Sequence, residues 1–560
     1  MDFRTVLKSW RARQGATPAA SEPAAVAADR AAAGELLRRG ALQRQGAQYD
    51  EAARNLTRAI ELWHGCGEAH HQLGLVHLEQ GRVEDAADCF QLATHFAPGL
   101  AAAHLDLGNF HKSRGELEQA AACYRAAIKA DPALWDAHCR LGFVLYKLGR
   151  YAESQASHAA ALAAKPDFAE MHHNLGLLLL ETGYAEEALR SFERALALRP
   201  ATPETLACIA HALRDLGRLD EALAQYNSVL ARPEQFGDAV INRCYALLMR
   251  GDYAAGWAEY ERRFTATATP ERGFPFPAWR GEPLSGKRIL VYAEQGLGDE
   301  IMFASCLPDV MQRAGHVVIE CNARLARLFA RSFPLATVHG GNKDDDRAWL
   351  RALPPADFQI AIGSLPLHFR SARSAFPVHC GYLRADAARV EFWRARLGAC
   401  NGRLRVGIAW RGGSLRSRQF TRSVTLPCWL PLLAQLDVDY VSLQYGDVAD
   451  ELARLRDQHG VMVRSFGDDI ADINELAAAI TALDLVISVD TTVVHLAGAL
   501  GHPVWVLLPS APEWRYPRSG ATMPWYPSAR LFRQAKPCEW APVISRVGDA
   551  MQQLAQVRDA

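Results

Sequence analysis

A glycine recurs every 34 residues along the first part of this chain, at Gly40, Gly74, Gly108, Gly142 and Gly176. Other positions keep the same period: after Gly74 come two small residues, an aromatic residue and a proline, namely Ala86, Ala93, Phe90 and Pro98. Small residues suit the place where two helices touch. Proline ends a helix because it lacks the N–H and clashes with the preceding turn. Units that cannot bury an apolar face alone must stack on their neighbours, so the period predicts a solenoid of helix pairs.

This repeat resembles the tetratricopeptide repeat in nearly every signature position. It predicts six repeats and a partial seventh over residues 34–265, with Ala210 and Cys244 in the glycine position of the last two. Residues 1–33 include an Ala-, Pro- and Ser-rich stretch and are expected to be mobile. Stacked helix pairs form a concave surface that binds another chain. We therefore expect a protein or peptide, as partner or acceptor, in the groove of the solenoid.

The sixth position of each repeat is expected to point into this groove. It forms a mixed polar row: Arg38, Gln72, Asp106, Arg140, Asn174 and Cys208. Such a row suits contact with a peptide, and a solvated helix face without a partner is the alternative. Four histidines nearby lack the i, i+4 spacing of a two-histidine metal site and are predicted to be ordinary polar residues: His71, His104, His172 and His173.

Composition excludes several classes of partner. Lys plus Arg and Asp plus Glu both number 62, so no net charge draws the chain to nucleic acid or anionic lipid. No apolar run reaches the roughly 18 residues that a membrane helix needs, and the first residues lack a signal-peptide pattern. The 12 cysteines form no C-x-x-C pair, so no zinc site is predicted. We expect a cytoplasmic protein without a metal or other cofactor.

The second half changes to short apolar runs that alternate with helical patterns. Residues 266–287 are a predicted linker, because Pro270, Gly273, Pro275, Pro277 and Pro283 break up any helix there. The predicted strands span residues 287–293, 316–320, 404–410, 439–443, 483–488 and 503–508, and helices are expected over 301–313, 473–483 and 493–500. This alternation predicts parallel sheets in two Rossmann-like domains, residues 288–402 and 403–535, with a ligand cleft between them. A helical tail is expected over residues 536–560.

The first candidate site follows the first of these strands. Gly296 and Gly298 allow a tight turn there, and Asp299 is expected at the start of the next helix, facing the cleft. A carboxylate in that place is a candidate general base. The alternative is that Asp299 only caps the helix.

Two further candidate sites lie in the second domain. Four arginines suit bidentate contacts to phosphate oxygens, unless their loop is simply solvated: Arg411, Arg416, Arg418 and Arg422. Ser488 ends a strand, and the helix that follows it offers its N-terminus to an anion. Asp490 is a candidate to hydrogen-bond a sugar hydroxyl. The hydroxyls of Thr491 and Thr492 are candidates to donate to the anion or, alternatively, to cap the helix. His495 lies one turn into the helix.

Taken together, Gly298-Asp299, the arginine loop and the run from Ser488 to His495 resemble the heptosyltransferase-type family (glycosyltransferase family 9) of GT-B glycosyltransferases. The likeness covers roughly residues 288–535 and is most specific at residues 490–497. It implies an α-solenoid followed by an α/β GT-B fold of two Rossmann-like domains. The lysine that heptosyltransferases place in the first loop of the second domain is not found here, which leaves the donor sugar open.

The resemblance also implies a mechanism. An inverting, metal-independent transfer from a nucleotide-diphosphate sugar would use Asp299 as the base. The helix start at Thr491–His495 and the arginines would bind the leaving nucleoside diphosphate, while Asp490 positions the donor. Protein O-GlcNAc transferases also join such repeats to a GT-B half, so by analogy a polypeptide acceptor is one candidate.

Two other functions were weighed against the sequence. An interaction scaffold with a sensing or degenerate GT-B domain is the alternative, and intact Asp299 and Asp490 count against it. A nucleotide-sugar epimerase or dehydrogenase is disfavoured because a G-x-G-x-x-G fingerprint is absent.

Overall fold

The computed structural model describes residues 23–200, 202–232, 237–266, 272–341, 347–399, 402–413, 418–435 and 437–559. It divides into two compact units. The first unit comprises Met1–Leu178 and Glu193–Pro200, and the second comprises Leu179–Phe192 and Ala201–Ala560. The second unit therefore holds both sheets together with the last helix pairs of the solenoid.

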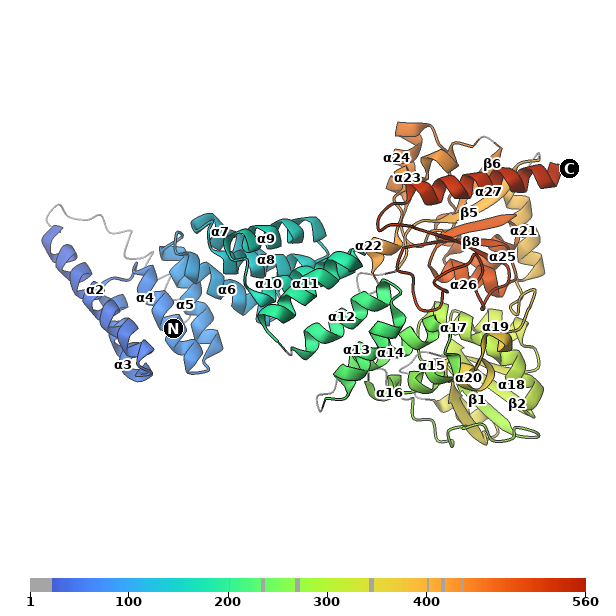
Figure 1. Cartoon of the computed structure of the whole chain (residues 1–560), viewed down its shortest axis with the longest axis horizontal. Coiled ribbons are helices and arrows are strands. Elements are labelled where there is room, and N and C mark those ends of the chain that lie inside the picture. The colour runs from blue at the N-terminus through green and yellow to red at the C-terminus, as the bar shows by residue number, and fades with distance from the viewer. Residues whose placement is uncertain are drawn as a thin grey trace. The chain divides into compact units, whose positions relative to one another are not determined.

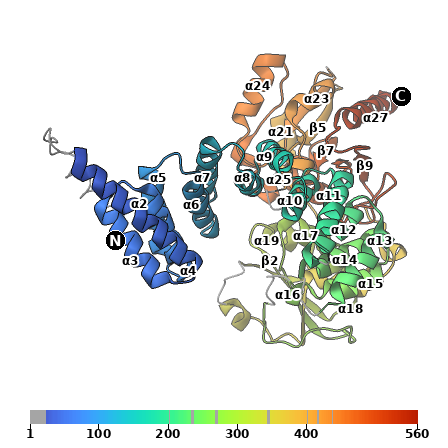
Figure 2. The same ribbon diagram turned by 60° about the vertical axis from the view of Figure 1, so that its left-hand side comes forward.

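Successive helix pairs make up the solenoid (Figures 1 and 2). The described pairs are α2 (Pro23–Gln45) and α3 (Tyr49–Leu62), α4 (Gly67–Glu79) and α5 (Val83–Phe96), α6 (Ala101–Ser113) and α7 (Leu117–Ala130), α8 (Trp135–Lys147) and α9 (Tyr151–Ala164), α10 (Ala169–Glu181) and α11 (Ala185–Leu198), α12 (Pro203–Asp215) and α13 (Leu219–Leu230), α14 (Gly237–Arg250) and α15 (Tyr253–Tyr260). Helix α2 already begins at Pro23, so residues 23–33, which we expected to be mobile, are helical. Residues 1–22 lie outside the described part.

The periodic glycines are required by close packing within each pair. A Cβ on Gly74 would lie 2.6 Å from the ring of Phe90, and one on Gly108 would lie 2.6 Å from Tyr124. A second series of glycines, in register with the first, has positive φ at the turn inside each pair after the first, as in Gly81 (φ 76°) and Gly115 (φ 76°), and Ala47 (φ 57°) takes this position in the first pair. These glycines end the first helix in the left-handed conformation that glycine adopts without strain. The helix-pair solenoid predicted from the period is confirmed.

The last helix pair is built into the core of the first α/β domain. Trp257 and Tyr260 of α15 are buried and belong to one apolar cluster with β1 and with helices of both sheets. The Trp257 indole N–H donates to the carbonyl of Arg370 at 2.9 Å. Helix α16 (Arg263–Ala266) continues from this pair, and its buried Arg263 pairs with Glu294, at 3.0 Å, just after β1.

The first sheet is parallel and has the strand order β3-β2-β1-β4. Its strands are β1 (Arg288–Tyr292), β2 (His316–Asn322), β3 (Thr337–Gly341) and β4 (Phe358–Ala361). Its helices are α17 (Leu297–Phe303), α18 (Leu307–Arg313), α19 (Ala326–Ser332) and α20 (Leu365–Phe369), whereas α21 (Ala387–Leu397) packs on α25 (Ile473–Thr481) of the second α/β domain. In register, Leu290 pairs with Val318 on one side and Gln359 on the other. The described part of the predicted linker is not loose, because Ala278 forms a parallel bridge with Gln359 at the edge of this sheet.

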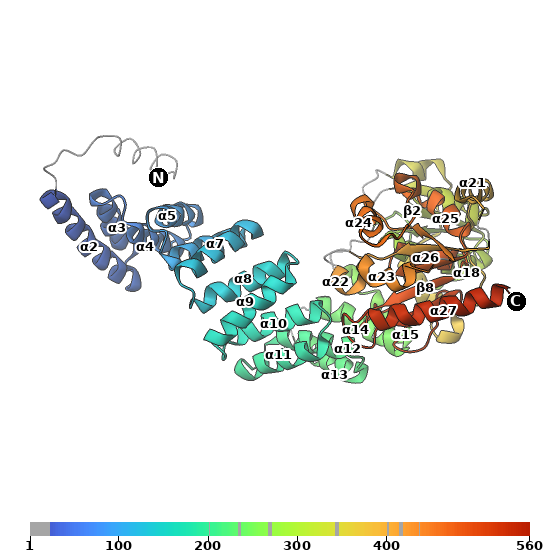
Figure 3. The same ribbon diagram turned by 90° about the horizontal axis from the view of Figure 1, so that it is seen from above.

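The second sheet is also parallel, with the order β6-β5-β7-β8-β9. Its strands are β5 (Leu404–Ala409), β6 (Val438–Ser442), β7 (Leu485–Val489), β8 (Val504–Leu508) and β9 (Ala529–Arg533). Its helices are α22 (Gln419–Arg422), α23 (Leu426–Leu433), α24 (Ala449–His459), α25 (Ile473–Thr481), α26 (Thr492–Ala499) and α27 (Ala541–Asp559). The strand order reverses direction between β5 and β7, which is where ligands bind in open α/β sheets. Helix α27 packs on α23 and places Val543 and Ile544 in the core of this domain (Figures 1 and 3).

Candidate functional site

Asp299 lies in the first turn of α17, at the carboxyl end of β1. The helix starts earlier than expected, with Gly296 as its N-cap and Asp299 as its third residue, so Asp299 does not serve as the cap. Helix α17 packs against α26 of the second domain (Figure 1). This packing brings the end of β1 to the end of β7, and the side chain of Asp299 stays 26% exposed.

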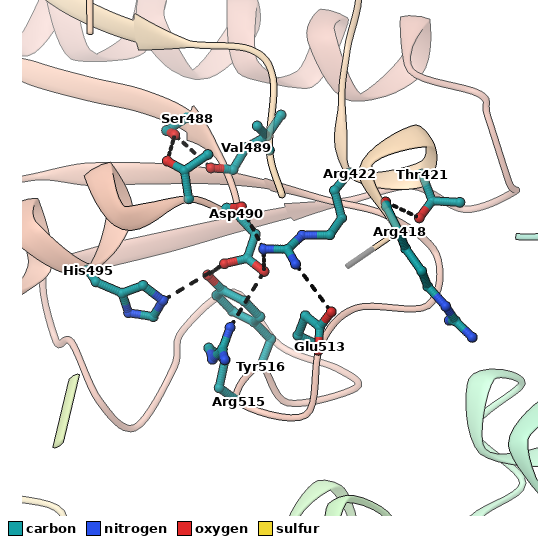
Figure 4. A network of polar contacts seen from close by, with 12 residues as sticks. Arg418, Thr421, Arg422, Ser488, Val489, Asp490, His495, Glu513, Arg515 and Tyr516 are labelled. Carbon is teal, nitrogen blue, oxygen red and sulfur yellow. Dashed lines mark hydrogen bonds and ion pairs between the residues drawn. The ribbon is translucent and has the colours of Figure 1, made fainter. Parts of the chain in front are cut away.

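Asp490 follows β7 and is the buried centre of the site (Figure 4). One Arg422 nitrogen lies 2.8 Å from its carboxylate and donates to its backbone carbonyl. The hydroxyl of Tyr516 donates to its other oxygen at 2.7 Å. Burial alone would raise the pKa of Asp490, but the charges of Arg422 and Arg515 outweigh it and lower the pKa. Asp490 is therefore a fixed anion that holds positive side chains in place.

Arg515 joins the two carboxylates. One of its nitrogens lies 2.9 Å from Asp299, and another lies 3.9 Å from Asp490. Burial raises the pKa of Asp299, Arg515 opposes this, and the nearby Asp490 and Glu513 raise it further, so the pKa stays above its ordinary value. A carboxyl group with a raised pKa is better matched to taking a proton near neutral pH.

Three residues of the site were not predicted from the sequence: Glu513, Arg515 and Tyr516. Their segment follows β8, whose carboxyl end lies at the same edge of the sheet as that of β7. This position was the available signal, since parallel strands present their following loops on one edge. The segment has no glycine pattern of its own. Glu513 lies 3.3 Å from Arg422 and extends the network around Asp490 (Figure 4).

The start of α26 completes the site. Thr491 is its N-cap and accepts from the Val493 N–H at 3.2 Å, so the capping alternative holds for this residue. Gly298 lies against α26: a Cβ there would be 3.0 Å from His495 and 3.7 Å from the Thr492 hydroxyl. His495 is buried, shares a hydrogen bond of 2.9 Å with the Tyr526 hydroxyl, and has its pKa lowered to about 3 by burial. It is therefore a neutral packing residue beside Asp490.

The structure separates the three described arginines of the predicted phosphate loop. Of these three, only Arg422 lies in the Asp490 network. Arg418 points away from it (Figure 4) and forms an ion pair of 2.5 Å with the buried Asp215 of α12. Arg411 pairs with Glu451 of α24 at 2.8 Å. Arg416 lies outside the described residues. The three described arginines thus do not form one phosphate site, because each pairs with a different acidic residue.

The polar row of the solenoid is partly engaged within the solenoid itself. Asp106 lies 2.8 Å from a ring nitrogen of His71, and Gln72 accepts from Arg44 at 3.1 Å. His104 and His172 each form a hydrogen bond to the backbone carbonyl six residues earlier. The interpretation of these histidines as ordinary polar residues agrees with the contacts.

Among the described residues, no group of three or more His, Cys, Asp and Glu side chains is placed to hold a metal ion. Among the helices of the described part, none has the length and apolarity needed to cross a membrane.

Family models match both halves of the chain. One tetratricopeptide-repeat model matches residues 37–101, 139–203 and 209–270. A second tetratricopeptide-repeat model matches residues 108–149. The model described as glycosyltransferase family 9 (heptosyltransferase) matches residues 471–542, which include Asp490 and Arg515. The chain therefore carries tetratricopeptide repeats and a glycosyltransferase family 9 segment.

Individual proteins are similar to parts of the chain. Protein FlbA of Caulobacter vibrioides is 34% identical over 339 residues, which cover 58% of this chain and 56% of FlbA. The match thus spans little more than half of that relative. A tetratricopeptide-repeat protein from Parabacteroides merdae is 15% identical over 43% of this chain and 94% of its own, with a TM-score of 0.33. YrrB, described as a repeat protein with an unusual peptide-binding site, is 19% identical over 30% of this chain and 88% of its own, with a TM-score of 0.29.

Proposed function

We propose that this chain, which joins tetratricopeptide repeats to a glycosyltransferase family 9 segment, is an inverting, metal-independent glycosyltransferase of the GT-B type. Its donor is a nucleotide-diphosphate sugar. The observation that carries the proposal is the pair Asp299 and Arg515, which comes from two different domains and meets at 2.9 Å beside the start of α26. It combines a base of raised pKa with a fixed positive charge at one point.

The proposed reaction is a single displacement. The acceptor hydroxyl attacks the anomeric carbon and passes its proton to the carboxylate of Asp299. The bond between the anomeric carbon and the diphosphate oxygen breaks, and the electron pair leaves with the nucleoside diphosphate. Attack from the side opposite the leaving group inverts the configuration at that carbon. Asp299 supplies the general base that this displacement needs.

Arginines take the part that a metal ion has in other transferases. Arg422 and Arg515 are both held by the Asp490 carboxylate, at 2.8 and 3.9 Å, and lie next to the N-terminus of α26. Helix N-termini and guanidinium groups stabilise anions such as a departing diphosphate. Because Asp490 fixes both arginines before the donor arrives, little reorganisation is needed during the reaction. Asp490 therefore positions the donor through its partners.

The acceptor is selected with help from the repeats. Tetratricopeptide repeats bind other proteins, and the last helix pair shares a core with the first α/β domain. An acceptor held by the solenoid is thus presented to a catalytic half that is continuous with it. A polypeptide acceptor agrees with this arrangement.

A thermal-shift screen tests the proposal. The purified protein is melted without added metal in the presence of ADP, GDP, UDP, CMP and their sugar conjugates. A selective ligand raises the melting temperature because it binds the folded state, and a ligand at 100 times its Kd adds about 2.7 kcal/mol. We expect one base to stand out, with the shift lost in Asp490→Ala and kept in Asp457→Ala, which changes an exposed aspartate of α24. A flat response from folded protein would contradict the proposal and favour a scaffold.

A further inference from the structure

A cavity of about 310 Å³ lies beside the Asp299–Arg515 pair. Its walls come from the last helix pair of the solenoid, from Arg373 after α20, and from the segments after β8 that carry Trp514, Arg515 and Trp525. All of these belong to the second unit. Because Arg515 is part of the wall and also contacts Asp299, a ligand in the cavity adjoins the proposed base.

The charged side chains that line the cavity are all positive. Arg250, Arg373 and Arg515 line it, and no acidic residue does so among the described residues. Arg250 is held from outside the cavity by Asp220 and Asp252. Arg373 is exposed, and its guanidinium forms no hydrogen bond or ion pair with any described residue. It is therefore available to a ligand. Guanidinium groups bind carboxylates and phosphates through two parallel hydrogen bonds.

The rest of the wall is aromatic and held rigidly. Trp514 stacks on Tyr245 with a centroid distance of 5.6 Å and an angle of 4° between the rings. Trp525 meets Phe376 edge to face at 4.9 Å, and Phe376 in turn packs against Tyr253. Rings fixed in this way offer apolar faces to a ligand ring at little entropic cost. The volume lies at the lower end of the roughly 300–1,000 Å³ that small-molecule pockets occupy, which suits a small ring.

We propose that this cavity binds a sugar ring that carries an oxyanion, a carboxylate or a phosphate, with Arg373 as the residue that selects the charge. The sugar ring packs on the aromatic wall, and Arg250 and Arg515 flank the anion. The inference rests on the proposed function for its assignment as a substrate site. The last helix pair of the solenoid then contributes directly to sugar recognition, in addition to any part it has in holding an acceptor.

Calorimetric titration of the full chain tests the inference without a nucleotide and without turnover. Three probes are compared: glucuronate, glucose 6-phosphate and neutral glucose. We expect one or both of the anions to bind at least tenfold more tightly than glucose, and the tighter anion identifies the oxyanion as carboxylate or phosphate. Arg373→Gln should weaken anion binding at least tenfold. Arg351→Gln, which changes an exposed arginine of the same domain, should leave it unchanged.

Two results would overturn the inference. One is that neither anion binds more tightly than glucose. The other is that Arg373→Gln binds the anions as the unchanged protein does. Arg373 is exposed in a short turn, so its replacement leaves the core intact, and a melting curve of the variant verifies this. A nucleotide-induced thermal shift together with a negative titration would contradict the cavity site alone, so the failures of the two proposals are distinguishable.

Discussion

Asp299 is the residue on which the proposed chemistry depends most directly. Asp299→Asn keeps a hydrogen-bond acceptor for Arg515 but removes the base, so we expect transfer to fall by about 10²–10⁴-fold while nucleotide binding survives. The pKa of Asp299 is raised, and only the deprotonated form accepts a proton. Activity should therefore decline as the pH falls through a value above the roughly 3.9 of an ordinary aspartate. Initial rates across a pH series check both points, and full activity in Asp299→Asn would refute the assignment.

His158 of α9 affects the folding stability of the solenoid and lies outside the proposed active site. It takes the place that Phe90 and Tyr124 have in other repeats, is fully buried, and lies against Gly142. Neither ring nitrogen has a hydrogen-bond partner among the described residues, and burial lowers the pKa of His158 to about 4.

His158→Phe should therefore stabilise the first unit, and more so in acid. The unfolded chain binds a proton on His158 near pH 6.5, whereas the folded chain binds it only near pH 4. His158 therefore leaves the free energy of unfolding unchanged above pH 6.5 and lowers it as the pH falls below that value. The loss at pH 5 is about 2 kcal/mol. Melting curves at pH 7.5 and pH 5 measure the gain, with His138→Gln, a change of a half-buried histidine that hydrogen-bonds the Pro132 carbonyl, as the control. An equal gain at both pH values would contradict the explanation.

At the scale of elements, the sequence predicted those features that depend on local pattern. The 34-residue period predicted the helix pairs, and short apolar runs such as Val504–Leu508 predicted the parallel strands. Features set by contacts between distant segments were not predicted. Arg418 reaches Asp215 about 200 residues earlier, and Arg515 reaches Asp299 from the other domain. No local pattern encodes such pairs, because each depends on how domains pack.

The ion pair between Asp215 of α12 and Arg418, just before α22, can be tested by mutation. Asp215 is buried and accepts hydrogen bonds from Arg214 and Arg418, and only three residues separate Arg418 from Arg422 at the proposed donor site. Asp215→Ala leaves two arginines without their buried partner, which costs about 3–5 kcal/mol, and loosens the segment that carries Arg422. We expect a lower melting temperature and nucleotide binding weakened several-fold. Asp238→Ala, an exposed aspartate of α14, is the control. Unchanged nucleotide affinity in Asp215→Ala would show that this pair does not support the donor site.

At the scale of the whole molecule, the boundary between the two units falls inside the solenoid. The first unit ends within the fifth helix pair, and the later pairs belong with the sheets. One apolar cluster runs from Cys244 of α14 through β1 to Leu531 of β9. The final repeats are therefore structural parts of the half that holds the two sheets. A chain of stacked repeats contacts only its neighbours, so the earlier repeats are stabilised separately.

Two matched core substitutions test this division. Trp257 is 1% exposed in the second unit, and Phe90 is 2% exposed in the first. Each change to alanine removes a large buried ring and should cost about 3–5 kcal/mol. If the units unfold separately, calorimetry of the full chain shows two transitions, and the bound nucleotide raises only the one that belongs to the second unit. We expect Trp257→Ala to lower that nucleotide-sensitive transition although its residue lies in a repeat, and Phe90→Ala to lower the other. A single transition lowered equally by both changes would mean that the repeats and the sheets unfold together. A nucleotide-sensitive transition unmoved by Trp257→Ala would instead mean that the last helix pair does not unfold with the sheets.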